Sequence, residues 1–135
     1  MAPDANRPRA QPSLFQPLYL SNTAMTVSIT QHTAHFATAP QISPEDMAAI
    51  AAHGFHTVIN NRPDFEGGPD QPTSQAMAQA AQAAGLAYHY LPVISGQITP
   101  QQVAEFAAAL KAAPGPVLAF CRSGARSTNM WHMGQ

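Results

Sequence analysis

Cysteine, charge and long apolar segments are all scarce in this sequence, and each scarcity excludes a class of protein. The chain has six Lys and Arg against seven Asp and Glu, so its net charge is -1. It therefore has no basic surface for nucleic acid or an anionic membrane, and we expect neither as a partner. No apolar stretch approaches the roughly 20 residues of a membrane-spanning helix, and no signal-peptide pattern is visible. A single cysteine cannot form an internal disulfide, which favours a reducing compartment, and we expect a cytoplasmic location.

The residues that are present suffice for one domain. The chain has 135 residues, of which 45% are hydrophobic, enough for a single core. Residues 1–30 begin with a segment rich in Pro, Gln and Asn and are predicted to be a disordered tail. The predicted domain therefore covers residues 31–135, and Met25 offers an alternative start of the chain.

Strand and helix signals alternate along the predicted domain. Ser43-Pro44 and Thr99-Pro100 each combine a capping residue with a proline in the first helical turn. The expected strands are 34–37, 55–60, 87–91 and 116–120, and the expected helices start near 43, 73, 99 and 126. This alternation predicts an α/β fold with a central, mostly parallel sheet flanked by helices.

The only cysteine directly follows the most apolar of these strands. Ligands of open α/β sheets lie beyond the carboxyl ends of the strands, and backbone N–H groups before a helix stabilise anions and thiolates. Cys121 is therefore predicted to be a nucleophile rather than an inert buried side chain. Arg126 offers a planar fork for two oxygens of an oxyanion, and Ser127 is expected to donate a hydrogen bond to the sulfur. The predicted anion-binding loop consists of Arg122, Ser123, Gly124, Ala125 and Ser127.

The loop also carries a resemblance to known families. Residues 121–127 resemble the active-site loop of rhodanese sulfurtransferases and are similar to that of cysteine-dependent phosphatases. The wider sequence resembles the phosphatase-like domain of the beta-lactamase-hydrolase-like family, which implies a fold like that of dual-specificity phosphatases. Some members of that family carry an attached metallo-β-lactamase-like domain with persulfide oxidation activity. The stretches that carry the resemblance are 41–46, 57–64, 91–93 and 116–127.

The length of the loop distinguishes phosphoester hydrolysis from sulfur transfer. A phosphatase signature places five residues between Cys and Arg, often with His before the Cys, whereas here four residues separate Cys121 from Arg126 and Phe120 precedes the cysteine. A shorter loop suits a bound sulfane sulfur better than a phosphoryl group, so the prediction is a sulfurtransferase that forms a Cys121 persulfide. Its partners would be a small anionic sulfur donor, such as thiosulfate or a persulfide, and a thiol acceptor. Arg122 and Arg126 would neutralise the donor.

Two alternatives remain open. The first is a cysteine-dependent phosphatase that acts on a phosphoester through a phosphocysteine. It needs a general acid, for which Asp64 is the first candidate, before Glu66 and Asp70. The second is a non-catalytic module that senses oxyanions or persulfides, which a solvent-shielded Cys121 would support. Arg62 is expected either to reach the same crevice or to be structural.

Other features bear on cofactors and assembly. The six histidines form no zinc pattern with the single cysteine, so we expect neither a metal nor another cofactor. The chain ends nine residues after Arg126, at Gln135. A homodimer in which a partner covers this short helix is therefore an open expectation.

Overall fold

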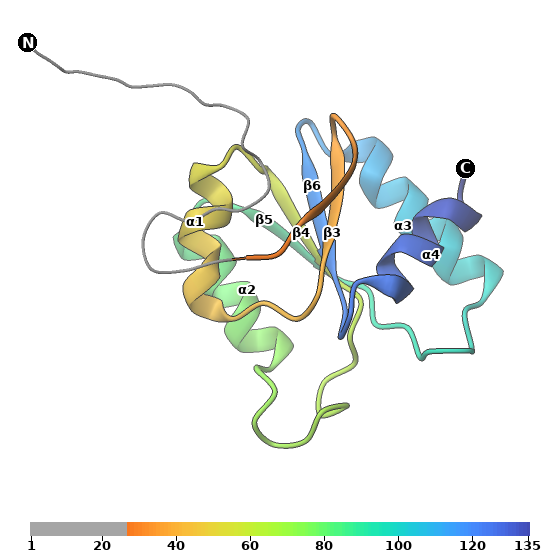
Figure 1. Ribbon diagram of the computed structural model, residues 1–135, viewed down its shortest axis with the longest axis horizontal. Coiled ribbons are helices and arrows are strands. Elements are labelled where there is room, and N and C mark those ends of the chain that lie inside the picture. Colours follow the sequence, from red (N-terminus) through yellow and green to blue (C-terminus); the bar gives the residue numbers. More distant parts are fainter. Residues whose placement is uncertain (1–26) are drawn as a thin grey trace, which may run out of the picture.

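The computed structural model describes residues 27–135, which form one mixed sheet between two pairs of helices. The strand order is β2-β3-β6-β4-β5, with β2 antiparallel to β3 and every other neighbouring pair parallel. Figure 1 shows α1 and α2 on one face of the sheet and α3 and α4 on the other. The predicted α/β class and mostly parallel sheet are confirmed. No helix within the described range is both long and apolar enough to cross a membrane.

The elements follow the predicted alternation closely. The strands are β2 (Thr30–Thr33), β3 (Phe36–Ala39), β4 (Thr57–Asn60), β5 (Ala87–Tyr90) and β6 (Val117–Phe120). The helices are the short 3₁₀ helix η2 (Pro44–Asp46), then α1 (Met47–Ala52), α2 (Ser74–Ala83), α3 (Pro100–Ala112) and α4 (Ala125–Met133).

Capping residues set where the longer helices begin. The Thr73 hydroxyl accepts the Ala76 N–H at 3.1 Å, which caps α2. At α3, Thr99 and Gln102 each bond the other's backbone N–H, at 3.1 and 2.9 Å. The predicted start at Thr99 is confirmed, because this reciprocal pair satisfies N–H groups that have no partner inside the helix.

The predicted position of the first strand is wrong, and the strand that precedes β3 was not predicted. Residues 34–37 were expected to be the first strand, but Ala34 and His35 form the turn of a β2–β3 hairpin. This turn contains no Gly, Asn or Pro to mark it in the sequence, and β2 is too polar to show alternation. Most of the predicted tail, including Met25, lies outside the described residues. Val27 is within them and is 3% exposed in the core.

Alternating side chains on the central strands build a core on each face of the sheet. On β6, Leu118 and Phe120 pack in the cluster beneath α1 and α2, whereas Val117 and Ala119 pack beneath α3 and α4. Phe106 of α3 is 1% exposed and belongs to the second cluster. The sequence of a strand that is buried on both faces is a continuous run of apolar residues, as in β6.

The two cores hold the carboxyl ends of three parallel strands together. β3, β6 and β4 end in register at Ala39, Phe120 and Asn60. The next residues remain joined across this edge, because the Asn61 N–H donates to the Phe120 carbonyl at 2.9 Å and the Gln41 N–H donates to the Arg122 carbonyl at 3.2 Å. The segments that follow the three strands therefore meet at one place.

Replacing Phe106 with Ala tests the core beneath α3 and α4. We expect the free energy of unfolding to fall by about 3–5 kcal/mol, because truncation of a buried Phe leaves a cavity. Urea denaturation of both proteins measures this loss. The control is Glu105→Ala on the exposed face of the same helix, which should change stability by less than about 0.5 kcal/mol. Equal effects of the two substitutions would contradict the assignment.

Candidate active site

Cys121 lies at the end of β6, beneath a tight loop. It is 1% exposed, and the Gly124 N–H donates to its sulfur at 3.1 Å. Gly124 has a φ of 93°, in the left-handed region, and a Cβ there would lie 3.4 Å from the backbone of Ala39. Glycine therefore allows the loop to turn its N–H toward the sulfur. A backbone N–H donor beside the first turn of α4 therefore faces the sulfur.

The Ser127 side chain is buried but does not serve the sulfur. Its hydroxyl donates to Asn61 Oδ1 at 2.8 Å, and Asn61 Nδ2 donates to the Leu91 carbonyl at 2.9 Å. The predicted hydrogen bond from Ser127 to the sulfur is therefore wrong, because the one hydroxyl proton is already committed. Ser127 instead ties α4 to the residue that follows β4.

Most of the N–H donors of the Arg126 guanidinium already form hydrogen bonds within the protein. Nη1 donates to Glu66 Oε2 and to the Val93 carbonyl, both at 2.9 Å, and Nη2 donates to Glu66 Oε1 at 3.1 Å. The Arg126 Nε is buried and has no partner among the described residues. A planar guanidinium has five N–H groups, so the Nε N–H and the second Nη2 N–H remain on the edge turned away from Glu66. These two parallel donors match two oxygens of an oxyanion.

Glu66 joins two arginines. Besides Arg126, it accepts a bond from Arg62 Nε at 2.9 Å, and Arg62 Nη1 donates to Gln41 Oε1 at 3.0 Å. The hydrogen bond from Arg126 is the main cause that lowers the pKa of Glu66; partial burial opposes it and Arg62 adds to it. Glu66 is thus an ionised partner of arginines rather than a proton donor. Arg62, for which two roles were open, both holds Glu66 and lines the crevice.

The loop after β4 is shaped to direct Glu66 inward. Phe65 has a φ of 66°, which is costly for a bulky residue, and its side chain is 68% exposed. At Gly67 a Cβ would lie 2.6 Å from Arg62 Nη2, so this position leaves room for the arginine. Gln71 accepts the Gly67 N–H at 2.7 Å and donates to the Pro63 carbonyl at 2.9 Å. These bonds hold the loop closed around the two arginines.

Asp64, the first candidate for a general acid, has a different position. Its Oδ1 accepts the Ser74 N–H at 2.7 Å, at the start of α2, and its own N–H donates to the Tyr90 hydroxyl at 2.9 Å. The Asp64 carboxylate is thus bonded to the first turn of α2. Neither Asp64 nor Asp70 lines the cavity beside the cysteine loop.

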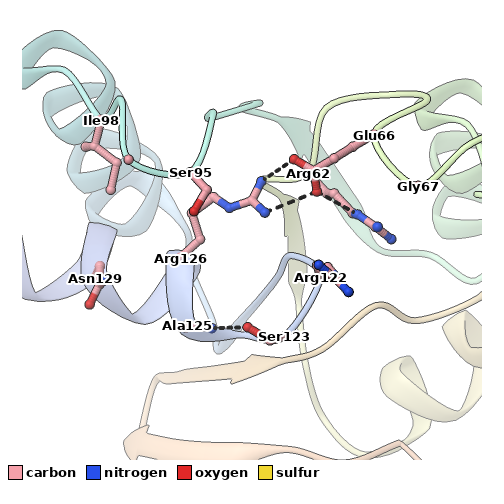
Figure 2. Close-up of a pocket in the computed structure, with 11 residues that line it drawn as sticks. Arg62, Glu66, Gly67, Ser95, Ile98, Arg122, Ser123, Ala125, Arg126 and Asn129 are labelled. Atoms are coloured by element: carbon pink, nitrogen blue, oxygen red, sulfur yellow. Dashed lines mark hydrogen bonds and ion pairs between the residues drawn. The ribbon is translucent and has the colours of Figure 1, made fainter.

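That cavity has a volume of about 890 Å³. Figure 2 shows Arg62 and Arg126 both reaching Glu66, while Arg122 extends from the loop with no dashed line to a neighbour. Cys121 is not among the lining residues but lies beneath the loop that forms one wall. The cavity is lined by Arg62, Glu66, Gly67, Ser95, Gly96, Ile98, Arg122, Ser123, Ala125, Arg126 and Asn129.

Two features of this site were not predicted. Asn61 is 0% exposed. The sequence could have indicated its importance, because two consecutive Asn residues at the end of an apolar strand cost free energy to bury unless they form hydrogen bonds. Glu66 was named only as a reserve acid. Its pairing with Arg126 spans 60 residues and has no local signal.

Comparison with known sequences places this geometry in context. The model of the phosphatase-like domain of beta-lactamase hydrolase-like proteins matches residues 28–135. A beta-lactamase hydrolase-like protein of Xylella fastidiosa is 36% identical over 95 residues, which cover 70% of this chain and 22% of that protein. The Agrobacterium fabrum protein of the same description is 37% identical over 90 residues, which cover 67% and 21%. The chain thus spans about a fifth of the length of these curated relatives.

Solved structures agree with this match. A candidate phosphatase from Neisseria meningitidis is 35% identical with a TM-score of 0.63, covering 72% of this chain and 68% of that one. A candidate phosphatase from Shewanella putrefaciens has a TM-score of 0.69 at 20% identity, covering 79% and 69%. A mutant form of Tk-PTP has a TM-score of 0.59 at 16% identity, covering 72% and 62%. The last two support the fold alone.

Replacing Glu66 with Gln tests the ion pair that holds Arg126. The Glu66 side chain is 28% exposed, so we expect a loss of only about 1 kcal/mol in unfolding free energy at pH 7. The folded pKa lies below the ordinary 4.5, so the stabilisation is complete above that value. It is lost as the pH falls through the folded pKa.

Urea denaturation of both proteins between pH 7 and pH 3 measures this difference. It should shrink toward zero as the pH falls. Glu105→Gln on exposed α3 makes the same charge change without an arginine partner among the described residues. A gap between wild type and Glu66→Gln that persisted at the acid end would contradict the role of the charge.

Proposed function

Because the chain belongs to the family of phosphatase-like domains of beta-lactamase hydrolase-like proteins, we propose that it is a cysteine-dependent phosphatase. Cys121 would be the nucleophile and Arg126 the main ligand of the phosphoryl group. The sequence alone favoured sulfur transfer, with phosphoester hydrolysis as the alternative. The family and a phosphatase candidate of 35% identity support the alternative better.

The observation that carries the proposal is the Nε edge of the Arg126 guanidinium, for which the described residues supply no partner. Its Nε has no partner among the described residues although it is buried, and buried donors of this kind normally have one. A phosphoryl group held by this edge, and by backbone N–H groups of the loop, would lie close to Cys121 at the start of α4. The arginines of the cavity wall would neutralise its charge.

The reaction would proceed in two displacements at phosphorus. The Cys121 thiolate attacks the phosphorus, the bond from phosphorus to the ester oxygen breaks, and the leaving oxygen takes a proton from water. Water then attacks the phosphocysteine, the bond from sulfur to phosphorus breaks, and inorganic phosphate leaves with the thiolate restored. Asp64 accepts the Ser74 N–H and Glu66 pairs with arginines, so in this proposal water rather than either carboxylate supplies the proton. Aryl phosphates, whose leaving groups need little protonation, are therefore the expected better substrates.

Sulfur transfer is the second candidate, and two observations favour it. Four residues separate Cys121 from Arg126, as in rhodanese-type loops. Asp64 is committed to the start of α2, and transfer of a sulfane sulfur between thiols needs no general acid. In this case Cys121 would carry a persulfide, and the same Arg126 edge would bind the anionic donor.

Replacing Cys121 with Ser tests the proposal directly. We expect hydrolysis of p-nitrophenyl phosphate to fall by at least about a thousandfold, because the variant lacks the nucleophile. Thiosulfate:cyanide sulfur transfer is measured on the same two proteins. Sulfur transfer that depends on Cys121, without phosphate release from any aryl phosphate, would overturn the phosphatase proposal in favour of the second candidate.

The reactivity of the buried sulfur distinguishes both candidate enzymes from a non-catalytic sensing module. Cys121 is 1% exposed, which is the condition that the module was expected to meet. A catalytic thiolate should still react with iodoacetate, and inorganic phosphate should slow that reaction by occupying the Arg126 edge. Peptide mass mapping over time measures the alkylation. A cysteine that stays unmodified until the protein is denatured would favour the module.

A further inference from the structure

One arginine of the cavity has no acidic partner within residues 27–135. Arg62 and Arg126 share the Glu66 carboxylate, whereas no described side chain forms an ion pair or hydrogen bond with Arg122. Among the described residues, Glu66 is the only acidic one that lines the cavity. The positive charge of Arg122 is therefore not neutralised by the described part of the chain.

Arg122 also differs from the other two in depth. The Arg62 and Arg126 side chains are 11% and 9% exposed, while Arg122 is exposed and extends from the loop (Figure 2). The Gln41 N–H bonds the Arg122 carbonyl at 3.2 Å, which fixes the backbone from which this side chain leaves. Arg126 thus lies at the inner wall of the cavity and Arg122 at its rim.

The size of the cavity leaves room beyond a phosphoryl group. Its volume of about 890 Å³ falls in the range of sites that enclose whole small molecules. Most of the described residues that line the cavity are polar, such as Ser95, Ser123 and Asn129, and Ile98 is a large apolar one. The organic part of a substrate would therefore lie within reach of Arg122.

We propose that the substrates of this site are small phosphoesters with a second acidic group, a carboxylate or another phosphate, which Arg122 binds. This rests on the proposed phosphatase function, in which the first phosphoryl group occupies the Arg126 edge. An arginine binds a carboxylate or a phosphate equally well through paired N–H donors. Arg122 is then a specificity-determining residue that distinguishes acidic from neutral esters.

Binding to the Cys121→Ser protein tests this without turnover. The probes are meta- and para-carboxyphenyl phosphate, and their controls are the matching carbamoylphenyl phosphates, which have the same shape without the second charge. Isothermal titration calorimetry should give carboxylates a Kd about three- to tenfold lower than the amides, as for a partly exposed charged pair. Adding Arg122→Gln should remove this preference. Adding Lys111→Gln, an equal charge change at an exposed position on α3, should leave it intact.

The outcomes separate the two proposals. Equal affinity for carboxylates and amides, or a preference that survives Arg122→Gln, would overturn the role of Arg122. A preference that Arg122→Gln abolishes supports it. If wild type hydrolyses none of these esters while the preference persists, the phosphatase function fails and the second anion subsite stands.

Discussion

The Glu66 carboxylate lies between Arg62 and Arg126, and the geometry of the site depends on this pairing. It occupies one edge of the Arg126 guanidinium and leaves the Nε edge without a partner among the described residues. A long arginine side chain free to rotate would lose rotamer entropy on binding an anion. Here that entropy has already been lost in folding, since Arg126 is held by Glu66 and by the Val93 carbonyl. The site is pre-organised for an oxyanion by an internal carboxylate.

The parallel sheet explains why residues so distant in sequence meet. β3, β6 and β4 end at one edge, so the segments that follow supply Gln41, Cys121 and Asn61 to the same place. The bond from Ser127 to Asn61 then fixes α4 against this edge, and Gly124 allows the loop between them to turn beneath the helix. The backbone of the loop positions the cysteine, and the Glu66 carboxylate and the Val93 carbonyl position the arginine.

Local signals in the sequence were enough for most elements and for the cysteine loop. Thr99 and Thr73 begin helices through bonds to residues three positions away, and β6 is a continuous apolar run. The β2–β3 hairpin was not predicted correctly because neither its turn nor its edge strand has a distinctive composition. The roles of Ser127, Asp64 and Glu66 depend on partners 66, 10 and 60 residues away. No spacing rule within one segment reveals such contacts, so the residues were identified but their roles were not.

The central claim is that Cys121 carries a phosphoryl group during turnover. Acid quench of wild type mixed with excess p-nitrophenyl phosphate, followed by peptide mass mapping, tests it most directly. The account predicts a transient mass increase of one phosphoryl group on the peptide that contains Cys121, absent from Cys121→Ser. Turnover of the ester with Cys121 unmodified at every time point, or a stable persulfide with no ester hydrolysis, would contradict it.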